Sequence, residues 1–192
     1  MDKKRCAWVP LHKPHYVQYH DEEWGVPVYD DQRLFEMLVL EGAQAGLSWE
    51  TILSKREGYR AAFHGFNPAL CAHMADAALE DLMHNDSIVR NRLKIFSVRN
   101  NAIAYLHIQK EYGTFSKYLW GFIAGKPVTN KWSHGTQVPV STPLSDQIAK
   151  DLKKRGMRFV GSTIVYAFMQ AIGLVNDHTT DCFRYQQILQ HR

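Results

Sequence analysis

A histidine and a cysteine four positions apart, in the stretch GLVNDHTTDC at residues 173–182, are the residues that most directly suggest chemistry. On a helix or in a tight turn this spacing points His178 and Cys182 in the same direction. An imidazole and a thiolate placed in this way form half of a zinc site. The only other cysteines are Cys6 and Cys71. The spacing of His178 and Cys182 does not identify the remaining metal ligands, and it does not decide whether the metal would be catalytic or structural.

A second group of candidates combines aromatic rings with one carboxylate. Glu41 shares a predicted helix face with apolar residues, and an inward carboxylate is costly unless it is paired or used. Its partner could be an arginine, a helix N-terminus or the N–H groups of a ligand. Rings around a carboxylate suit a flat, positively charged heterocycle, although aromatic residues more commonly form ordinary core. The rings in question are Trp8, Tyr16, Tyr19, Trp24 and Trp49.

Helices are the elements predicted to position these residues, since no useful period-2 strand pattern occurs. The stretch at 30–46 carries Leu34, Phe35 and Leu38 at helical spacing, on the face of Glu41. The stretch at 91–113 predicts a long helix that ends on Gly113. Its expected apolar face consists of Leu93, Phe96, Ile103 and Leu106.

Local signals predict where several helices begin. Ser48, Asn67 and Thr114 each precede a helical pattern as N-cap residues, and Pro68 follows Asn67 at the first helical position. Residues 126–143 hold three prolines without a steady period. They predict an irregular connection between two lobes.

Two predicted helices at 144–156 and 162–173 are separated by the short sequence MRFVG. Gly156 and Gly161 bracket this loop, as in a helix-hairpin-helix unit, where loop N–H groups and a helix N-terminus can hold a phosphate. The alternative is an ordinary helical hairpin with a solvated basic face. The basic residues around the loop are Lys150, Lys153, Lys154, Arg155 and Arg158.

Composition predicts one compact globular unit over residues 1–192, because the chain is 45% hydrophobic and has no low-complexity tract. The first residues lack the apolar run of a signal peptide, and no stretch is long enough to span a membrane. We therefore expect a cytoplasmic protein, with no membrane partner and with thiols or metal ligands rather than disulfides. A net charge of +4 does not decide whether DNA is bound.

Several blocks in the same order resemble the DNA-3-methyladenine glycosylase I family of bacteria, nearly from end to end. They are RCAWV, YHDEEWGVP, LFEMLVLEGAQAGLSWETIL, KKRGMRFVGSTIVYAFMQAIGLVNDH and the final Cys182. The resemblance implies an all-α fold of the helix-hairpin-helix DNA glycosylase superfamily, with a zinc site joining the N- and C-terminal segments. The hairpin lobe would cover roughly 142–173, and the zinc-linked termini would be 6–20 and 178–182.

The resemblance also implies the metal ligands. They are Cys6, His20, His178 and Cys182. Four protein ligands leave no open position for water, so the single Zn²⁺ would be structural. His12 and His15 compete with His20 by proximity alone, whereas Cys71 is interpreted as a small core residue.

Base and DNA contacts are implied in the same way. Glu41 would be the catalytic residue, and Trp8, Tyr16, Tyr19 and Trp49 would bind the base with it; Trp24 would form a further wall of the pocket. Gly46 and Leu47 would form a wedge that enters the duplex, and Gln44 would fill the gap left by the extruded base. The hairpin would contact DNA through Gly156, Arg158 and Gly161.

The implied reaction is hydrolytic removal of 3-methyladenine from double-stranded alkylated DNA by a monomeric enzyme. No lysine is placed by motif as a Schiff-base nucleophile, which indicates no strand cleavage. Asp177 and Asp181 are expected to cap the chain locally or to support the zinc ligands. Two alternatives are a zinc-stabilised DNA-binding module without activity and a zinc hydrolase, and the sequence leaves open whether 3-methylguanine is also removed.

Overall fold

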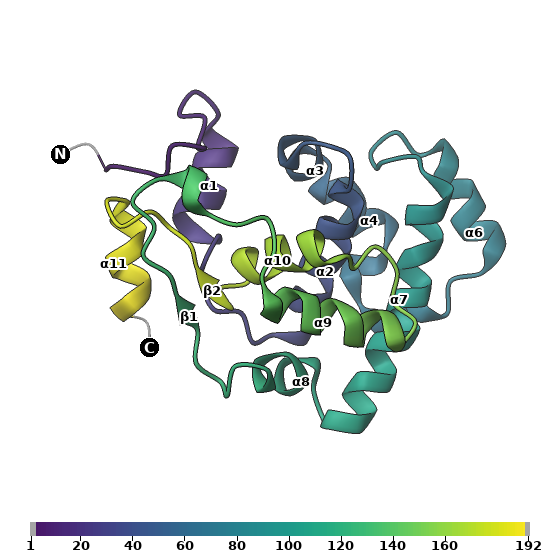
Figure 1. The fold of residues 1–192 in the computed structure, drawn as a ribbon. Helices are drawn as coiled ribbons and strands as arrows, with labels where there is room; N and C mark the ends of the chain where they lie inside the picture. Colours follow the sequence, from purple (N-terminus) through teal and green to yellow (C-terminus); the bar gives the residue numbers. More distant parts are fainter. Residues whose placement is uncertain (1–2, 191–192) are drawn as a thin grey trace.

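The computed structural model describes residues 3–190, and Figure 1 shows that helices are its main elements. In chain order the elements are α1 (Pro14–Glu22), α2 (Asp31–Gln44), α3 (Trp49–Ser54), α4 (Arg56–Ala62), the 3-10 turn η1 (His64–Phe66), α5 (Pro68–Ala72), α6 (Asp76–Asp81), η2 (Leu82–His84), α7 (Arg92–Tyr112), α8 (Phe115–Gly121), β1 (Val128–Thr129), η3 (Gly135–Gln137), α9 (Pro143–Lys154), α10 (Ser162–Ala171), β2 (Val175–Asn176) and α11 (Phe183–Gln190).

The predicted helix starts are confirmed by their hydrogen bonds. The side chains of Ser48, Asn67 and Thr114 each accept a hydrogen bond from a backbone N–H in the first turn of α3, α5 and α8. The predicted stops are confirmed as well, because Gly113 and Gly156 follow α7 and α9 with φ of +85° and +95°. The helical fold therefore follows from local signals at these ends.

The long helix α7 differs from its prediction in the face that it buries. Leu93 is 63% exposed and Ile103 is 41% exposed. The buried face instead includes Ile95, Val98 and Ala102. Helices α2 and α5 pack against α7, so the positions of the neighbouring helices select the face that is buried.

The 126–143 connection is irregular as predicted, apart from the short strand β1 and the 3-10 turn η3. Strand β1 pairs with β2, which lies outside the connection. Val128 pairs with Val175 and Thr129 with Asn176 in a parallel two-residue sheet. Two residues cannot produce a recognisable alternating pattern in the sequence. The pairing attaches the connection to the segment that leads into His178.

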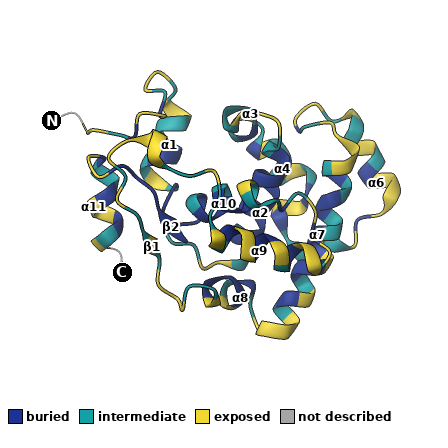
Figure 2. Ribbon diagram, in the orientation of Figure 1, coloured by how far each residue is buried: buried dark blue, intermediate teal, exposed yellow. Residues whose placement is uncertain are grey.

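The hairpin of α9 and α10 packs against α2 and closes the core. Ile148 and Leu152 on α9, and Val165 and Phe168 on α10, have no exposed surface, as their helical spacing predicted. Figure 2 shows buried residues of α2 and α10 at the centre of the molecule, while Figure 1 places α1 and α11 on the same side of it. Among residues 3–190, no helix is long and apolar enough to cross a membrane.

Candidate functional site

A cavity of about 310 Å³ opens between α1, the end of α2, the start of α3, α10 and the 126–143 connection. Gly135 and Val138 of the connection contribute to its wall. The ring and acid residues singled out in the sequence also line it: Trp8, Tyr16, Tyr19, Trp24, Glu41, Gln44 and Trp49. Its size suits one small heterocycle.

The aromatic rings contact one another in a continuous series around this cavity. The ring centroids of Trp8 and Tyr16 are 5.8 Å apart, those of Tyr16 and Tyr19 are 6.5 Å apart, and those of Tyr19 and Trp49 are 5.2 Å apart. Trp24 meets Trp8 edge to face at 4.9 Å. Mutual packing restrains the rings, so the cavity presents rigid aromatic surfaces for stacking.

Glu41 is 4% exposed, and no described residue donates a hydrogen bond to its carboxyl group. Burial raises its pKa to about 8. Glu36, on the same helix, is also buried but accepts hydrogen bonds from Arg33, Arg56 and Arg60. Although burial acts to raise the pKa of Glu36, Arg56 and Arg33 hold it below its ordinary value. Of these two glutamates, the one that lines the cavity is therefore the one without a partner.

Trp49 supplies a second polar atom without a partner. Its indole Nε1 is buried and has no hydrogen-bond acceptor within residues 3–190. Glu41 and Trp49 thus give the cavity an unused carboxyl group and an unused N–H donor. A ligand that carries both N–H groups and a ring nitrogen acceptor would satisfy both.

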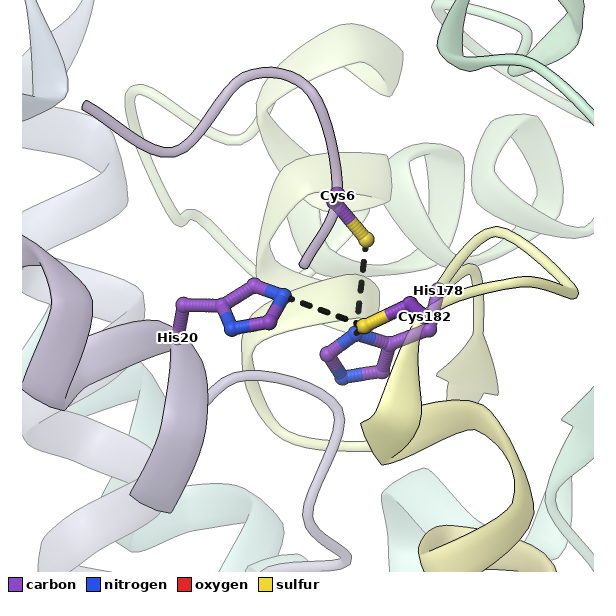
Figure 3. Close-up of side chains that lie close together, drawn as sticks. All are labelled: Cys6, His20, His178 and Cys182. Carbon is purple, nitrogen blue, oxygen red and sulfur yellow. Dashed lines mark hydrogen bonds between the residues drawn. The ribbon is translucent and has the colours of Figure 1, made fainter. Parts of the chain in front are cut away.

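A second cluster adjoins the cavity, which Cys6 also lines, where Cys6, His20, His178 and Cys182 converge (Figure 3). Their nearest ligand atoms all lie within 4.8 Å of one another, and all four residues are buried. The Nδ1 atom of His178 is 3.5 Å from both sulfur atoms, and the Nε2 atom of His20 is 3.5 Å from the Cys182 Sγ.

These distances fit a tetrahedral metal. Bonds of about 2.3 Å to sulfur and about 2.0–2.1 Å to nitrogen place the two ligand atoms about 3.5 Å apart. The pKa of the Cys182 thiol is lowered by hydrogen bonding with the Cys6 thiol and with both histidines, which favours the thiolate form that binds metals. The residues present therefore fit a Cys2His2 zinc ion.

Each histidine is oriented by a partner on its other ring nitrogen. The Nδ1 of His20 donates to Asp21 at 2.8 Å, and Arg5 in turn donates to the Asp21 carboxylate at 2.7 Å. The Nε2 of His178 donates to the backbone carbonyl of Trp24 at 3.0 Å. These bonds leave the inner nitrogens free to bind a metal. The sequence interpretation missed Asp21, although it directly follows His20.

Asp177 and Asp181 have different surroundings. Asp177 is buried and accepts hydrogen bonds at 2.5–2.9 Å from four side chains, none of which belongs to the Cys/His cluster: Asn130, Trp132, Tyr166 and Gln170. Asp181 lies at the surface and pairs with Lys4 at 2.6 Å. Asp177 therefore attaches the 126–143 connection to α10, which the sequence interpretation did not anticipate.

The loop after α2 forms a tight turn that presents Leu47 to solvent. The Leu47 backbone N–H donates to the Gln44 carbonyl at 2.7 Å, and the Gln44 amide group donates to the Leu47 carbonyl at 3.3 Å. Gly46 has a φ of +77°, which a residue with a side chain rarely adopts. Leu47 is 40% exposed and lies in the chain between Gln44 and Trp49, which both line the cavity.

The hairpin loop leaves its glycines open. A Cβ atom added at Gly156 or Gly161 would meet nothing within 4 Å, and Arg158 is exposed. Arg155 differs from the expected basic cluster, because it pairs with Asp151 at 2.6 Å and Glu111 at 2.7 Å. The exposed positive charge here comes from the remaining basic residues, Lys150, Lys153, Lys154 and Arg158.

The other candidates for metal binding lie apart from the cluster. His12 and His15 are exposed, and neither belongs to the cluster of potential ligands. Cys71 is fully buried, and its thiol donates to the Phe63 carbonyl at 3.1 Å. This position agrees with the prediction of a core residue.

A largely helical fold around an aromatic cavity with an unpaired carboxyl group is an arrangement that suits a flat nitrogen heterocycle. A family model described as methyladenine glycosylase matches residues 8–185. The chain is 48% identical over 182 residues to DNA-3-methyladenine glycosylase 1 of Escherichia coli, covering 95% of this chain and 97% of that protein.

Solved structures agree with this assignment. A crystal structure of 3-methyladenine DNA glycosylase I has a TM-score of 0.91 to this chain at 50% identity, covering 94% of this chain and 98% of the other. A structure that addresses 3-methyladenine recognition by the Staphylococcus aureus glycosylase has a TM-score of 0.87 at 41% identity, covering 89% and 91% of the two chains. The protein belongs to the methyladenine glycosylase family, and it is therefore an enzyme that cleaves N-glycosyl bonds.

Proposed function

We propose that this enzyme removes 3-methyladenine from alkylated double-stranded DNA by hydrolysis, without cleaving the strand. The observation that carries the proposal is the buried Glu41 carboxyl group, which has no described hydrogen-bond partner and faces a cavity walled by aromatic rings. The names of the relatives in Escherichia coli and Staphylococcus aureus support this substrate.

Charge complementarity explains the selection of the methylated base. Methylation at N3 makes adenine cationic and weakens its glycosidic bond, so little acid catalysis is needed. With a pKa of about 8, Glu41 is mainly protonated at neutral pH in the free protein. When the cationic base arrives, Glu41 releases its proton to solvent and accepts hydrogen bonds from the base as a carboxylate. Neutral adenine gains no such ion pair.

Stacking provides the second part of recognition. Trp8, Tyr16, Tyr19 and Trp49 enclose the base, and a cationic ring gains cation–π attraction in addition to dispersion. The buried indole N–H of Trp49 can donate to a ring nitrogen of the same base. Water then attacks C1′ as the base departs through an oxocarbenium-like state. No lysine lines the cavity among residues 3–190, which supports hydrolysis rather than Schiff-base chemistry.

Base extrusion is assigned to the loop after α2. Leu47 would enter the duplex as an apolar wedge, with Gly46 allowing the turn, and Gln44 would occupy the space of the missing base. The hairpin would hold the DNA backbone through loop N–H groups near Gly156 and Gly161, with Arg158 as a phosphate partner. These contacts do not depend on sequence, as a search for damage requires.

The cluster of Cys6, His20, His178 and Cys182 would hold one structural Zn²⁺. A bound zinc ion would supply folding free energy, since four protein ligands complete its coordination. The cluster joins the segment 6–20 to the segment 178–182, and Cys6 and Thr179 also line the base cavity. The metal site would thus hold one wall of the cavity in place.

Release of free 3-methyladenine from methylated duplex DNA is the measurement that tests the proposal. We expect the wild-type protein to release the base and to leave abasic sites with intact strands. Glu41→Gln should reduce the excision rate by at least about 100-fold, while circular dichroism shows an unchanged fold. DNA binding without base release would instead identify a zinc-stabilised DNA-binding module, and full activity of Glu41→Gln would exclude the proposed role of Glu41.

A further inference from the structure

A lysine on α7 is attached to the end of the helix that carries Glu41. The Lys94 ammonium group donates hydrogen bonds to the backbone carbonyls of Ala43 at 2.8 Å and Ala45 at 2.6 Å. Both carbonyls lie where α2 ends and where the turn of residues 44–47 begins. We call this turn the wedge turn, because it carries Leu47. Lys94 therefore holds the residues that directly precede Gly46 and Leu47.

A second polar residue of α7 holds the hairpin loop. The amide group of Asn101 accepts a hydrogen bond from the Arg158 backbone N–H at 2.8 Å and donates one to the Arg158 carbonyl at 3.0 Å. Asn101 is 3% exposed, so both bonds are shielded from water. One helix thus holds both loops that would meet the DNA.

These attachments converge on a tightly packed junction. A void of only about 10 Å³ remains where Ala43, Lys94, Asn101 and Phe159 meet Gly42. A Cβ atom added at Gly42 would lie 3.2 Å from the Phe159 Cβ and 3.3 Å from its carbonyl oxygen. The end of α2, the start of α7 and the hairpin loop can therefore shift little relative to one another.

We propose that Lys94 is a positioning residue that fixes the wedge turn relative to the hairpin, so that gripping the backbone brings Leu47 to the damaged base pair. The inference rests on the proposed function. The ammonium group suits this task, because it donates to two helix-terminal carbonyls at once and offsets the negative end of the α2 dipole. Its head group does not line the base cavity, so Lys94 acts through the turn rather than on the base.

Loss of the Lys94 ammonium group should impair base extrusion but not base binding. In Lys94→Met the stem remains while both charge-assisted hydrogen bonds are lost, which should loosen the turn. We expect the single-turnover excision rate on duplex DNA to fall about tenfold. Excision from single-stranded methylated DNA, which needs no wedge, should fall less than about twofold, as should the affinity for free 3-methyladenine measured by tryptophan fluorescence.

Four further variants complete the test. Lys110→Met removes the same charge from an exposed position near the other end of α7, and it should match the wild type. Lys94→Arg retains donors and should recover part of the duplex rate. Leu47→Ala should show the same selective duplex defect, and the double variant Lys94→Met/Leu47→Ala should be no slower than Leu47→Ala alone, because both changes act on one step.

Several results would overturn the role of Lys94. One is an unchanged duplex rate in Lys94→Met, and another is an equal loss on duplex and single-stranded DNA. Weaker binding of Lys94→Met to unmodified duplex, with a reduced salt dependence, would show instead that Lys94 contacts a phosphate. If the wild-type protein released no 3-methyladenine from either substrate, the proposed function itself would fail.

Discussion

Glu36 and Glu41 are two buried glutamates of one helix with different surroundings. The surroundings of Glu36 suit a role in stability, and those of Glu41 suit a role in function. Glu36 lies among arginines from α2 and α4, and its ion pairs connect these helices. Glu41 has no such partner and faces the cavity. The free protein therefore carries an energetic cost at Glu41 that the proposed cationic ligand would remove on binding.

This cost predicts how stability depends on pH. The pKa of Glu41 is about 8 in the folded protein, whereas glutamate has a pKa of about 4.3 in an unfolded chain. Between these pH values the folded state retains a proton that the unfolded state releases, so stability falls as the pH rises. Glu41→Gln lacks this dependence and should be more stable than the wild type, by about 3–5 kcal/mol at pH 8.5 and by almost nothing near pH 4.

Thermal or urea denaturation of both proteins between pH 4 and pH 9 measures this difference. Glu36→Gln is the control, because it breaks an existing set of ion pairs and should destabilise the protein at neutral pH. A constant stability difference between Glu41→Gln and the wild type across this range would contradict the raised pKa.

Among single residues, the sequence indicated Glu41 and the rings but not the groups that hold them. Glu41 was recognisable because a carboxylate interrupts an apolar helix face. Asp21 and Lys94 were not, since an acid or a lysine in a polar stretch looks like surface. Asp177 was noted, but its attachment of the 126–143 connection was not predicted. Their roles arise from contacts between segments distant in the chain, which spacing within one segment does not encode.

At the scale of elements, local signals and packing differ in what they determine. Caps and glycines set the ends of α3, α5 and α7, because these signals act within one turn. The prediction of the buried face of α7 was wrong, because the face that is buried depends on which helices pack against α7. The same limit applies to β1, whose pairing with β2 joins segments far apart in the sequence.

We predict that Asp177 holds the 126–143 connection in place, and that the connection in turn forms a wall of the cavity. Trp132→Phe removes the indole N–H that donates to Asp177 at 2.8 Å but keeps an aromatic ring. We expect faster amide hydrogen exchange at residues 130–138 and an affinity for free 3-methyladenine that is about threefold to tenfold lower.

Exchange in α9 should stay at the wild-type level in this variant, which separates a local effect from general destabilisation. Trp120→Phe is a matched control, since its indole N–H donates to the Val28 carbonyl away from the cavity. Equal base affinity of Trp132→Phe and the wild type would show that the connection does not shape the pocket.

At the scale of the whole molecule, the Cys/His cluster joins two segments that are far apart in the sequence. Spacing revealed only the pair of His178 and Cys182, and the partners near the other end came from resemblance to a family. In the structure the four ligand atoms converge within 4.8 Å. No pattern within either segment contains this contact, because it depends on the path of all the helices between them.

Removal of the metal should destabilise the fold. We expect a strong chelator to lower the melting temperature by roughly 10 °C, as the loss of a few kcal/mol would in a domain of this size. The affinity for free base should fall in parallel, because His178 donates to the Trp24 carbonyl beside the cavity.

Metal content measured by atomic absorption completes this experiment. Cys182→Ser should lose the metal, whereas Cys71→Ala should retain one equivalent, because Cys71 lies outside the cluster. If chelation abolished excision while the melting temperature stayed constant, the metal would be catalytic and the structural assignment would be wrong.

The position of the four ligands also has a consequence for biosynthesis. Cys6 and His20 leave the ribosome early, but the coordination cannot be completed before residue 182 has been made. Any translation product that ends before this residue lacks a metal ligand, so the metal would not join its first segment to the rest of the fold. Metal capture would thus mark polypeptides synthesised as far as Cys182, and prematurely terminated products would stay open to proteases.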